Sequence, residues 1–265
     1  MIEIPYTKLH GAENDFLLTW GEAAPPSRLP EIAQRICART TGMGADGWML
    51  AWKENGGLRT RLFNSDGSEP EISGNGTRCA AAFGISQGAV EPPEVRVVTG
   101  AGRKILRLIS RKNLQFLFEM DMGVPQTEQL RMDLQLAGQS FDVTTLNVGN
   151  PQCAIFVDTI PENWRGAARE AERHPFFPQR TNVSFVRVID RHTVDAVFYE
   201  RGAGETRSSG TGSTGAGVAA ILRNEAESPL EIRTPAGSLR LRWDESVYLT
   251  GPAEIIGEGR FFLDL

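Results

Sequence analysis

The sequence lacks several features that would place the protein in common classes. No apolar run approaches the roughly 20 residues that a helix needs to cross a bilayer, so no membrane partner is expected. No stripe of Lys and Arg is present and the net charge of −5 is mild, which argues against nucleic acid as a partner. The opening segment, Met1 to Tyr6, contains an acidic residue and alternates like a strand, unlike a signal peptide.

Cysteine and histidine are also scarce. The three cysteines, Cys37, Cys79 and Cys153, form no C-x-x-C motif, and one stays unpaired in any disulfide scheme. We therefore expect a reduced, cytoplasmic setting. The three histidines show no E-x-x-H or H-x-H spacing, so no zinc or other metal site is expected.

What the sequence does contain is a long-range repeat. Two similar motifs lie 136 positions apart and each opens a run of small residues: Ser73-Gly74-Asn75-Gly76 and Ser209-Gly210-Thr211-Gly212. The same offset, without a gap, relates four further pairs of polar residues: Asn14 and Asn150, Asp46 and Asn182, Asn64 and Glu200, and Glu69 and Glu205. Several matches in one register over most of the chain indicate an internal duplication.

Strand-like segments dominate both halves, and helical patterns are fewer. Helices are expected over residues 29–39 and 163–172, and two more begin at Gly74 and Gly210. The last two consist of small residues all round, as a helix needs when a sheet packs closely on every side. The expected strands are residues 17–20, 48–51, 58–63, 95–99, 105–109, 114–120, 141–146, 154–157, 182–188, 194–199, 230–234, 238–243 and 247–250.

These patterns predict an α+β fold of two pseudo-symmetric lobes. Each lobe is expected to be a mixed, largely antiparallel sheet curled around a central helix. With 265 residues, of which 40% are hydrophobic, each lobe can bury a core of its own. We place the lobes at residues 1–122 and 123–265, with a joint at residues 120–126, and the last strand could return to the first lobe.

The two Gly-rich helix starts are candidate anion sites. Gly-x-Gly leaves the first backbone N–H groups of a helix unobstructed, at the positive end of its dipole. The glycines could instead serve only close packing of helix on sheet. The duplication favours binding, because packing does not require asparagines and acids to repeat in the same register. The polar lining of such a site would come from Asn14, Asn64, Asn150, Asn182, Glu200 and Arg201, although each Asn taken singly would pass for a turn residue.

Taken together, these motifs resemble the diaminopimelate epimerase family of cofactor-independent amino-acid racemases and epimerases. The resemblance runs in order from residue 8 to about residue 220. The matching stretches are residues 8–16 (KLHGAENDF), 42–47 (GMGADG), 63–69 (FNSDGSE), 74–79 (GNGTRC), 149–151 (GNP), 177–182 (FPQRTN), 199–206 (YERGAGET) and 210–212 (GTG).

The resemblance implies a mechanism and a set of site residues. In the family, two lobes close over one free amino acid such as diaminopimelate, and a cysteine at each helix start acts on one face of the α-carbon, without pyridoxal phosphate or another cofactor. The family also suggests a homodimer. By this resemblance the substrate-binding residues here are Asn14, Asn64, Gly74, Asn75, Asn150, Asn182, Glu200, Arg201, Gly210 and Thr211.

The chain departs from the family where the chemistry takes place. Both catalytic cysteine positions hold serine, Ser73 and Ser209, and the histidine that follows the family's Gly-Asn-Pro motif is Gln152. A thiol has a pKa near 8.5, whereas an alkanol is closer to the ~15.7 of water. The gap of roughly 7 units corresponds to about 10 kcal/mol for forming the base, at about 1.36 kcal/mol per unit. Thiol-type racemisation is therefore expected to be very slow.

Three explanations of these departures remain open. The serines could be an engineered pair in an active epimerase, made to trap substrate or prevent a disulfide. The chain could be a natural paralogue that runs another proton transfer, with Glu200 or Asp66 as base. It could also be an amino-acid binder without turnover. Gln152 serves no trapping purpose, which favours natural divergence.

Overall fold

The computed structural model describes residues 1–264 and forms two compact units. Unit 1 comprises Met1–Met120 together with the segment from Gly251 onward, and unit 2 comprises Asp121–Thr250. Within the described residues, no helix is long and apolar enough to cross a membrane.

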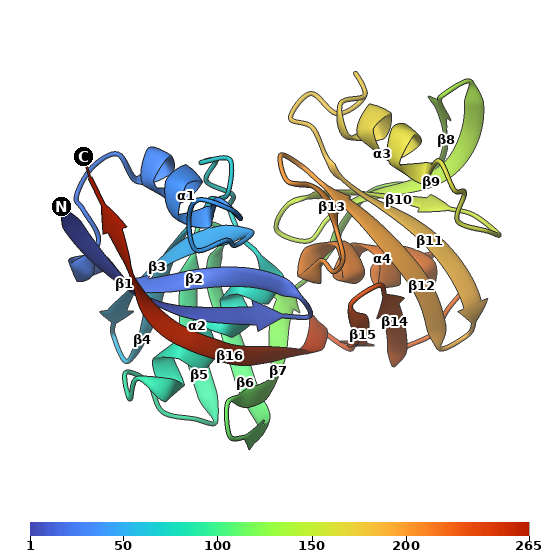
Figure 1. The fold of residues 1–265 in the computed structure, drawn as a ribbon. Helices are drawn as coiled ribbons and strands as arrows, with labels where there is room; N and C mark the ends of the chain where they lie inside the picture. Colours follow the sequence, from blue (N-terminus) through green and yellow to red (C-terminus); the bar gives the residue numbers. More distant parts are fainter. Residues whose placement is uncertain (265) are drawn as a thin grey trace. The chain divides into compact units, whose positions relative to one another are not determined.

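Unit 1 is a closed barrel of strands around one helix. In spatial order, β1 to β7 are hydrogen-bonded neighbours, and β16 closes the barrel by pairing with both β7 and β1. The buried helix α2 lies among these strands (Figure 1). The strands are β1 (Ile2–Gly11), β2 (Asn14–Trp20), β3 (Gly47–Glu54), β4 (Gly57–Asn64), β5 (Glu94–Thr99), β6 (Gly102–Lys112), β7 (Gln115–Gly123) and β16 (Val247–Leu263), and the helices are η1 (Gly21–Ala23), α1 (Leu29–Cys37) and α2 (Gly74–Ser86).

The composition of α2 explains its central position. Every residue from Gly74 to Ile85 is buried, so no face of this helix meets solvent. Its body is largely Ala and Gly, and such small side chains let the barrel wall approach the helix from all sides. The first turn of α2 therefore lies inside the barrel, where the surrounding strands fix its position.

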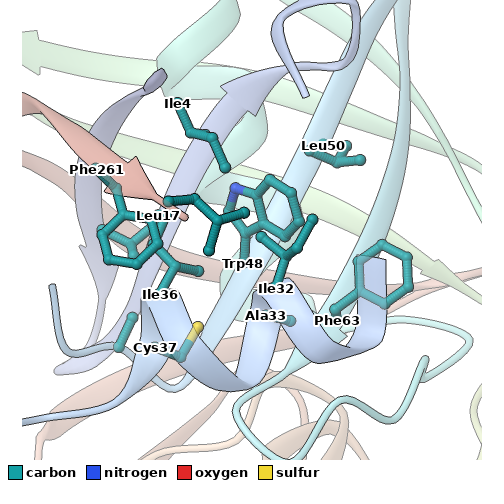
Figure 2. Packing of buried hydrophobic residues seen from close by; sticks show 12 residues of the cluster. Ile4, Leu17, Ile32, Ala33, Ile36, Cys37, Trp48, Leu50, Phe63 and Phe261 are labelled. Atoms are coloured by element: carbon teal, nitrogen blue, oxygen red, sulfur yellow. The ribbon is translucent and has the colours of Figure 1, made fainter. Parts of the chain in front are cut away.

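The helix α1 covers the outside of the same sheet. Its apolar face carries Ile32, Ala33, Ile36 and Cys37, spaced as an amphipathic helix requires. Figure 2 shows this face packed on side chains of the strands beneath it, including Leu17, Trp48 and Phe63. Burial of these apolar side chains from both the helix and the strands stabilises unit 1.

Unit 2 contains one buried helix and one covering helix as well. Residues Gly210 to Ala220 of α4 are all buried. The covering helix α3 packs Trp164, Ala167, Ala168 and Ala171 onto the sheet. The strands are β8 (Gln126–Leu136), β9 (Gln139–Asn147), β10 (Pro151–Phe156), β11 (Asn182–Asp190), β12 (Thr193–Glu200), β13 (Gly204–Thr206), β14 (Leu230–Thr234) and β15 (Gly237–Trp243), and the helices are α3 (Trp164–Glu172) and α4 (Gly210–Leu222).

The two units share one topology. In unit 1 the pairings from β1 to β7 run antiparallel, parallel, antiparallel, parallel, antiparallel, antiparallel. In unit 2 the same order recurs along β9, β10, β11, β12, β14, β15 and β16. In both units the covering helix joins the first parallel pair and the buried helix joins the second. The predicted α+β class with two pseudo-symmetric lobes, each curled around a central helix, is confirmed.

Several strands differ from the sequence-based expectation: β1, β8 and β13 were not among the expected strands, and β16 is longer than expected. The strand β8 was not predicted, because most of its residues are exposed and polar and only Leu134 and Leu136 are buried. The last strand, expected at residues 247–250, continues to Leu263. Its first part pairs with β15 in unit 2, and the part beyond Gly251 pairs with β1 in unit 1.

Candidate active site

The first group of predicted site residues meets at the start of α2. We call Asn14, Asn64, Ser73, Gly74 and Asn75 half-site 1. Ser73 is the N-cap of α2, with extended backbone (φ −121°, ψ 120°), and its Oγ accepts a hydrogen bond from the backbone N–H of Gly76 at 3.1 Å. The preceding N–H groups of the first turn have no carbonyl partner within the helix, as at any helix start.

Asn14 reaches this helix start from the β1–β2 hairpin. Its Oδ1 accepts a hydrogen bond from Asn75 Nδ2 at 3.3 Å. The two hairpin residues before it, Ala12 and Glu13, both have positive φ (51° and 61°), an arrangement that usually requires Gly or Asn. At Gly11 an added Cβ would lie 3.1 Å from the backbone O of Asn75. A glycine at this position lets the hairpin close on the helix start.

A pair of carboxylates, buried Asp15 and half-buried Asp46, supports Asn14 from behind. Asn14 Nδ2 donates to Asp46 Oδ2 at 2.6 Å. Arg39 bridges the two acids, donating to Asp15 from both Nη atoms at 2.9 Å and to Asp46 Oδ1 at 2.7 Å. Lys8 Nζ lies 3.1 Å from Asp15 Oδ2, so two cations balance the two anions.

The two acids titrate in opposite directions. Burial alone would raise the pKa of Asp15, but the hydrogen bonds and charges of Arg39 and Lys8 outweigh it, so the pKa of Asp15 is lowered. The pKa of Asp46 is raised, chiefly by burial, with the negative charge of Asp15 adding to the effect. Hydrogen bonds from Asn14 and the backbone of Asp15, together with the charge of Arg39, oppose the rise.

Asn64 lies beside Asp46 at the end of β4. It is the strand partner of Gly47, and the backbone N–H of Ser65 donates to the Asp46 carbonyl at 2.9 Å. Its Nδ2 donates to Ser68 Oγ at 2.9 Å. Through Asp46, which accepts from Asn14, the end of β4 is linked to the other expected residues of unit 1.

The second group meets at the start of α4, and we call Asn150, Gln152, Ser209, Gly210 and Thr211 half-site 2. Ser209 caps α4 as Ser73 caps α2, accepting from the N–H of Gly212 at 3.0 Å. Asn150 Nδ2 donates to Thr211 Oγ1 at 3.3 Å, which repeats the Asn14–Asn75 contact at the same sequence separation of 61 residues. Gln152 Nε2 donates to Asn150 Oδ1 at 2.6 Å.

The remaining expected residues of unit 2 line up next to half-site 2. Asn182 is the strand partner of Gln152, and its Nδ2 donates to the carbonyl of Pro151 at 2.9 Å. Its Oδ1 accepts from the backbone N–H of Arg201 at 3.0 Å. Glu200 Oε1 accepts from Thr206 Oγ1 at 3.2 Å. The contacts of Asn182 join segments that are 31 and 19 residues apart, so local sequence patterns did not predict them.

None of the three native cysteines offers a reactive thiolate near neutral pH. All are free and buried, and burial is the largest cause that raises the pKa of Cys37, Cys79 and Cys153 to about 12 each. Within residues 1–264, no three side chains of His, Cys, Asp and Glu gather in a group that could hold a metal ion.

The structure adds residues to which the sequence gave no role. Asp15 and Arg39 hold Asp46 from one side, as described above. Arg78, fully buried in α2, donates to Asn75 Oδ1 from Nη2 at 2.5 Å and to the carbonyl of Pro252 from Nε at 3.1 Å. Asp15 and Arg78 do fall inside motifs that resemble the family, which was the only available signal.

The fold is shared with several solved structures of low sequence identity. A hydroxyproline epimerase from Agrobacterium vitis aligns with a TM-score of 0.77 at 15% identity, covering 99% of this chain and 93% of that one. A phenazine biosynthesis protein of the PhzF family from Bacillus anthracis aligns with a TM-score of 0.73 at 13% identity, covering 99% and 100%. The chain therefore shares the fold of these two proteins.

Sequence comparison assigns the family. The family model described as diaminopimelate epimerase matches residues 6–128 and 144–256. The diaminopimelate epimerase of Moorella thermoacetica is 38% identical, with 98% of this chain and 99% of that protein aligned. That of Pelotomaculum thermopropionicum is 36% identical, with 97% and 98% aligned. The chain belongs to the diaminopimelate epimerase family and is an isomerase of the epimerase class.

Proposed function

We propose that the chain acts on diaminopimelate or a closely related amino acid and inverts its α-carbon by removing and returning a proton, without pyridoxal phosphate. The observation that carries this proposal is the family assignment over nearly the whole chain, together with the repeated serine-capped helix starts. Diaminopimelate epimerisation would place the chain in lysine biosynthesis.

The geometry supports specific roles within each half-site. The uncapped N–H groups of a helix start, with the dipole behind them, suit a carboxylate or the carbanion that forms next to it. The amides of Asn14, Asn75 and Asn150 supply neutral donors and acceptors, and Arg201 supplies a charged donor. By the family resemblance, Ser73 and Ser209 stand at the positions of the two catalytic cysteines.

Turnover is expected to be slow, because serine is a poor base. We propose that the chain is a diverged relative in which binding persists and thiol chemistry is lost. Of the other candidate bases, Asp66 Oδ1 accepts from the backbone N–H of Ser68 at 2.8 Å and also from its hydroxyl, which ties it to its own turn. The other candidate is Glu200, whose Oε1 accepts from Thr206 Oγ1.

Exchange of the substrate α-proton tests this function. The chain is incubated with LL-diaminopimelate in heavy water, and loss of the α-proton signal is followed by NMR. We expect slow exchange that rises by several orders of magnitude when both Ser73→Cys and Ser209→Cys are introduced. If the double variant stays inert and neither form binds the ligand, the proposal is wrong.

A binder without turnover is the second candidate, favoured by the same serines. Calorimetry distinguishes it: diaminopimelate binds, Ser73→Ala leaves the affinity unchanged, and no α-proton exchange is found. Arg201→Ala is expected to weaken binding roughly 10- to 150-fold in either case, since a guanidinium that pairs with a carboxylate contributes about 1.5–3 kcal/mol.

We further propose a homodimer in the cytoplasm and a duplication boundary within residues 120–126. The family resemblance supports the homodimer. The three free, buried cysteines suit a reducing compartment, although free thiols alone do not require one. Light scattering after gel filtration tests the dimer, and a single species of about 29 kDa would overturn it.

A further inference from the structure

A chain of hydrogen bonds in half-site 1 is charged at both ends. It runs from Arg78 to Asn75, from Asn75 to Asn14 and from Asn14 to Asp46. A carboxamide has a donor end and an acceptor end that differ little in shape, so its direction is set by its partners. The guanidinium of Arg78 can only donate hydrogen bonds, and the ionised carboxylate of Asp46 can only accept them. The carboxamides of Asn75 and Asn14 between them can therefore adopt only one orientation, with Oδ1 toward Arg78 and Nδ2 toward Asp46.

Burying the charged side chain of Arg78 at this position costs free energy. Its side chain has no exposed surface, and no group within residues 1–264 accepts a hydrogen bond from its Nη1. Burial lowers its pKa to about 10, so it is still charged at neutral pH. A buried charge with one bare nitrogen is costly, and an apolar side chain of similar length would pack there more cheaply. Packing alone therefore does not explain why an arginine occupies this buried position.

Asp46 fixes the other end of the chain. One carboxylate oxygen accepts from Asn14 Nδ2 and from the backbone N–H of Asp15, and the other accepts from Arg39. With its Nδ2 held by Asp46, Asn14 turns its Oδ1 toward α2. Arg39 favours the charged form of Asp46 that this direction needs, against the opposing effects of burial and of the Asp15 charge.

In half-site 2, neither charged residue of this hydrogen-bond chain has a charged counterpart. The hydrogen bonds there also run in the opposite direction, toward the helix start. The positions related to Arg78 and Asp46 by the 136-residue offset are Thr214 and Asn182. Thr214 Oγ1 donates to the carbonyl of Gly210 in its own helix and not to Thr211. Here Gln152 donates to Asn150, which donates to Thr211, so Asn150 turns its Nδ2 toward α4.

We propose that Arg78 and Asp46 are positioning residues: through Asn75 and Asn14 they fix the direction of the amides at the start of α2, which is opposite to the direction of Asn150 at the start of α4. The amide directions are a property of unit 1 alone. The effect on a ligand rests on the proposed function.

The test compares four single variants of the full chain. Arg78→Met and Asp46→Asn each remove one charged end, and Asp46→Asn introduces the residue type found at the related position of unit 2. Arg78→Lys keeps the charge and one donor, so it guards against an Arg78→Met variant that fails to fold. Thr214→Val is the matched control on α4.

The first measurement needs no ligand. Side-chain NH₂ signals of Asn14 and Asn75 are assigned in ¹H–¹⁵N spectra with Asn14→Ala and Asn75→Ala, and their exchange with solvent is measured. We expect exchange to be about tenfold or more faster in Arg78→Met and Asp46→Asn, less affected in Arg78→Lys, and unchanged in Thr214→Val. Backbone amides of α2 should stay protected in all four. Unchanged side-chain exchange in Asp46→Asn and in the folded Arg78 variants would overturn the proposal.

The second measurement is calorimetry with LL-diaminopimelate. We expect Arg78→Met and Asp46→Asn to bind about tenfold or more weakly, Arg78→Lys to recover part of the affinity, and Thr214→Val to match the unchanged chain. If the unchanged chain does not bind diaminopimelate, the proposed function fails while the exchange measurement still decides the roles of Arg78 and Asp46. Normal affinity in variants with fast amide exchange would overturn the effect on the ligand.

Discussion

Asp15 and Asp46 show how two neighbouring carboxylates come to have different pKa values. They share Arg39, but Asp15 also has Lys8, whereas Asp46 faces the charge of Asp15 and accepts from neutral Asn14. The pKa of Asp15 is consequently lowered and that of Asp46 is raised. The pair therefore makes the stability of unit 1 depend on pH in two separate windows.

We predict that Asp46→Asn changes how the free energy of unfolding depends on pH, in the range above the ordinary aspartate pKa of about 3.9. A raised folded pKa gives stability that is present below the unfolded value and lost as pH rises through the folded value. Replacing Asp46 removes that loss, so urea unfolding just above the ordinary aspartate pKa should give a more positive slope of unfolding free energy against pH than in the unchanged chain.

Asp15→Asn is the matched control for this prediction. Because the pKa of Asp15 is lowered, its contribution is present above the unfolded value and is lost as pH falls through the folded value. This variant should change the slope below about pH 4. Equal slopes for all three proteins across both windows would contradict the assigned directions.

The cysteines lead to a second prediction for single residues. Burial raises the pKa of each native thiol to about 12, so the folded chain should not react with iodoacetamide near neutral pH, whereas all three thiols should react after unfolding. Ser73→Cys should add one reactive thiol, since residue 73 is half-buried at a helix start, where the dipole favours the thiolate.

Ser209→Cys provides the comparison for that experiment. Ser209 also caps a helix but is only 2% exposed, so its replacement should react more slowly than that of Ser73. Mass spectrometry of the labelled, folded proteins counts the modified residues. Rapid labelling of Cys37, Cys79 or Cys153 in the folded chain would show that burial does not protect them.

At the scale of elements, the buried helices α2 and α4 begin with similar sequences. The space around the third residue of each helix, Gly76 and Gly212, is bounded by different side chains. At Gly76, an added Cβ would lie 2.8 Å from Met49 Cε, the flexible end of a side chain. At Gly212, it would lie 2.7 Å from the ring carbon Cδ1 of Phe198, which is itself buried, and 2.9 Å from Ser209 Oγ. The same substitution therefore meets different neighbours in the two units.

We predict that Gly212→Ala destabilises the chain more than Gly76→Ala does. Alanine in a helix gains up to about 1 kcal/mol over glycine. At Gly76 the Met49 side chain can move, so the net change should stay within about 1 kcal/mol. At Gly212 the ring cannot yield as easily, and overpacking should cost about 1–3 kcal/mol. Urea unfolding measures both, and an equal or larger loss in Gly76→Ala would contradict the prediction.

At the scale of the whole molecule, β16 belongs to both units. From Glu254 to Leu263 it pairs with β1, and earlier, from Val247 to Thr250, it pairs with β15. It is also the neighbour of β7, so the barrel of unit 1 is closed only when the end of the chain is in place. Unit 1 is therefore not a contiguous segment of the sequence.

We predict that a chain ending at Thr250 loses the fold of unit 1 before that of unit 2. Removing the later part of β16 leaves β1 and β7 as open edges with unpaired backbone groups. Hydrogen exchange should show lost protection in β1 and β7, and retained protection in β10 and β11, which do not contact β16. Protection of β1 equal to that in the full chain would contradict this role of β16.

The sequence predicted the helices and most strands because their signals are local. The spacing of Ile32 and Ile36 marks α1, and the serine-glycine motifs mark the first turns of α2 and α4. The strand β8 gave no such signal, since an edge of polar residues with two buried leucines does not alternate clearly. The end of β16 was missed because it is stabilised by a partner some 250 residues away.

The sequence by itself determined the duplication, the two capped helix starts and the family, because each depends on residue identity at fixed spacing. Only the tertiary structure decided which way the asparagine amides point, that Arg78 and Asp46 hold them, and that Asp15 and Asp46 titrate apart. The physical reason is that the direction of a hydrogen bond and the pKa of a buried acid depend on partners brought together by folding, and spacing along the chain does not encode them.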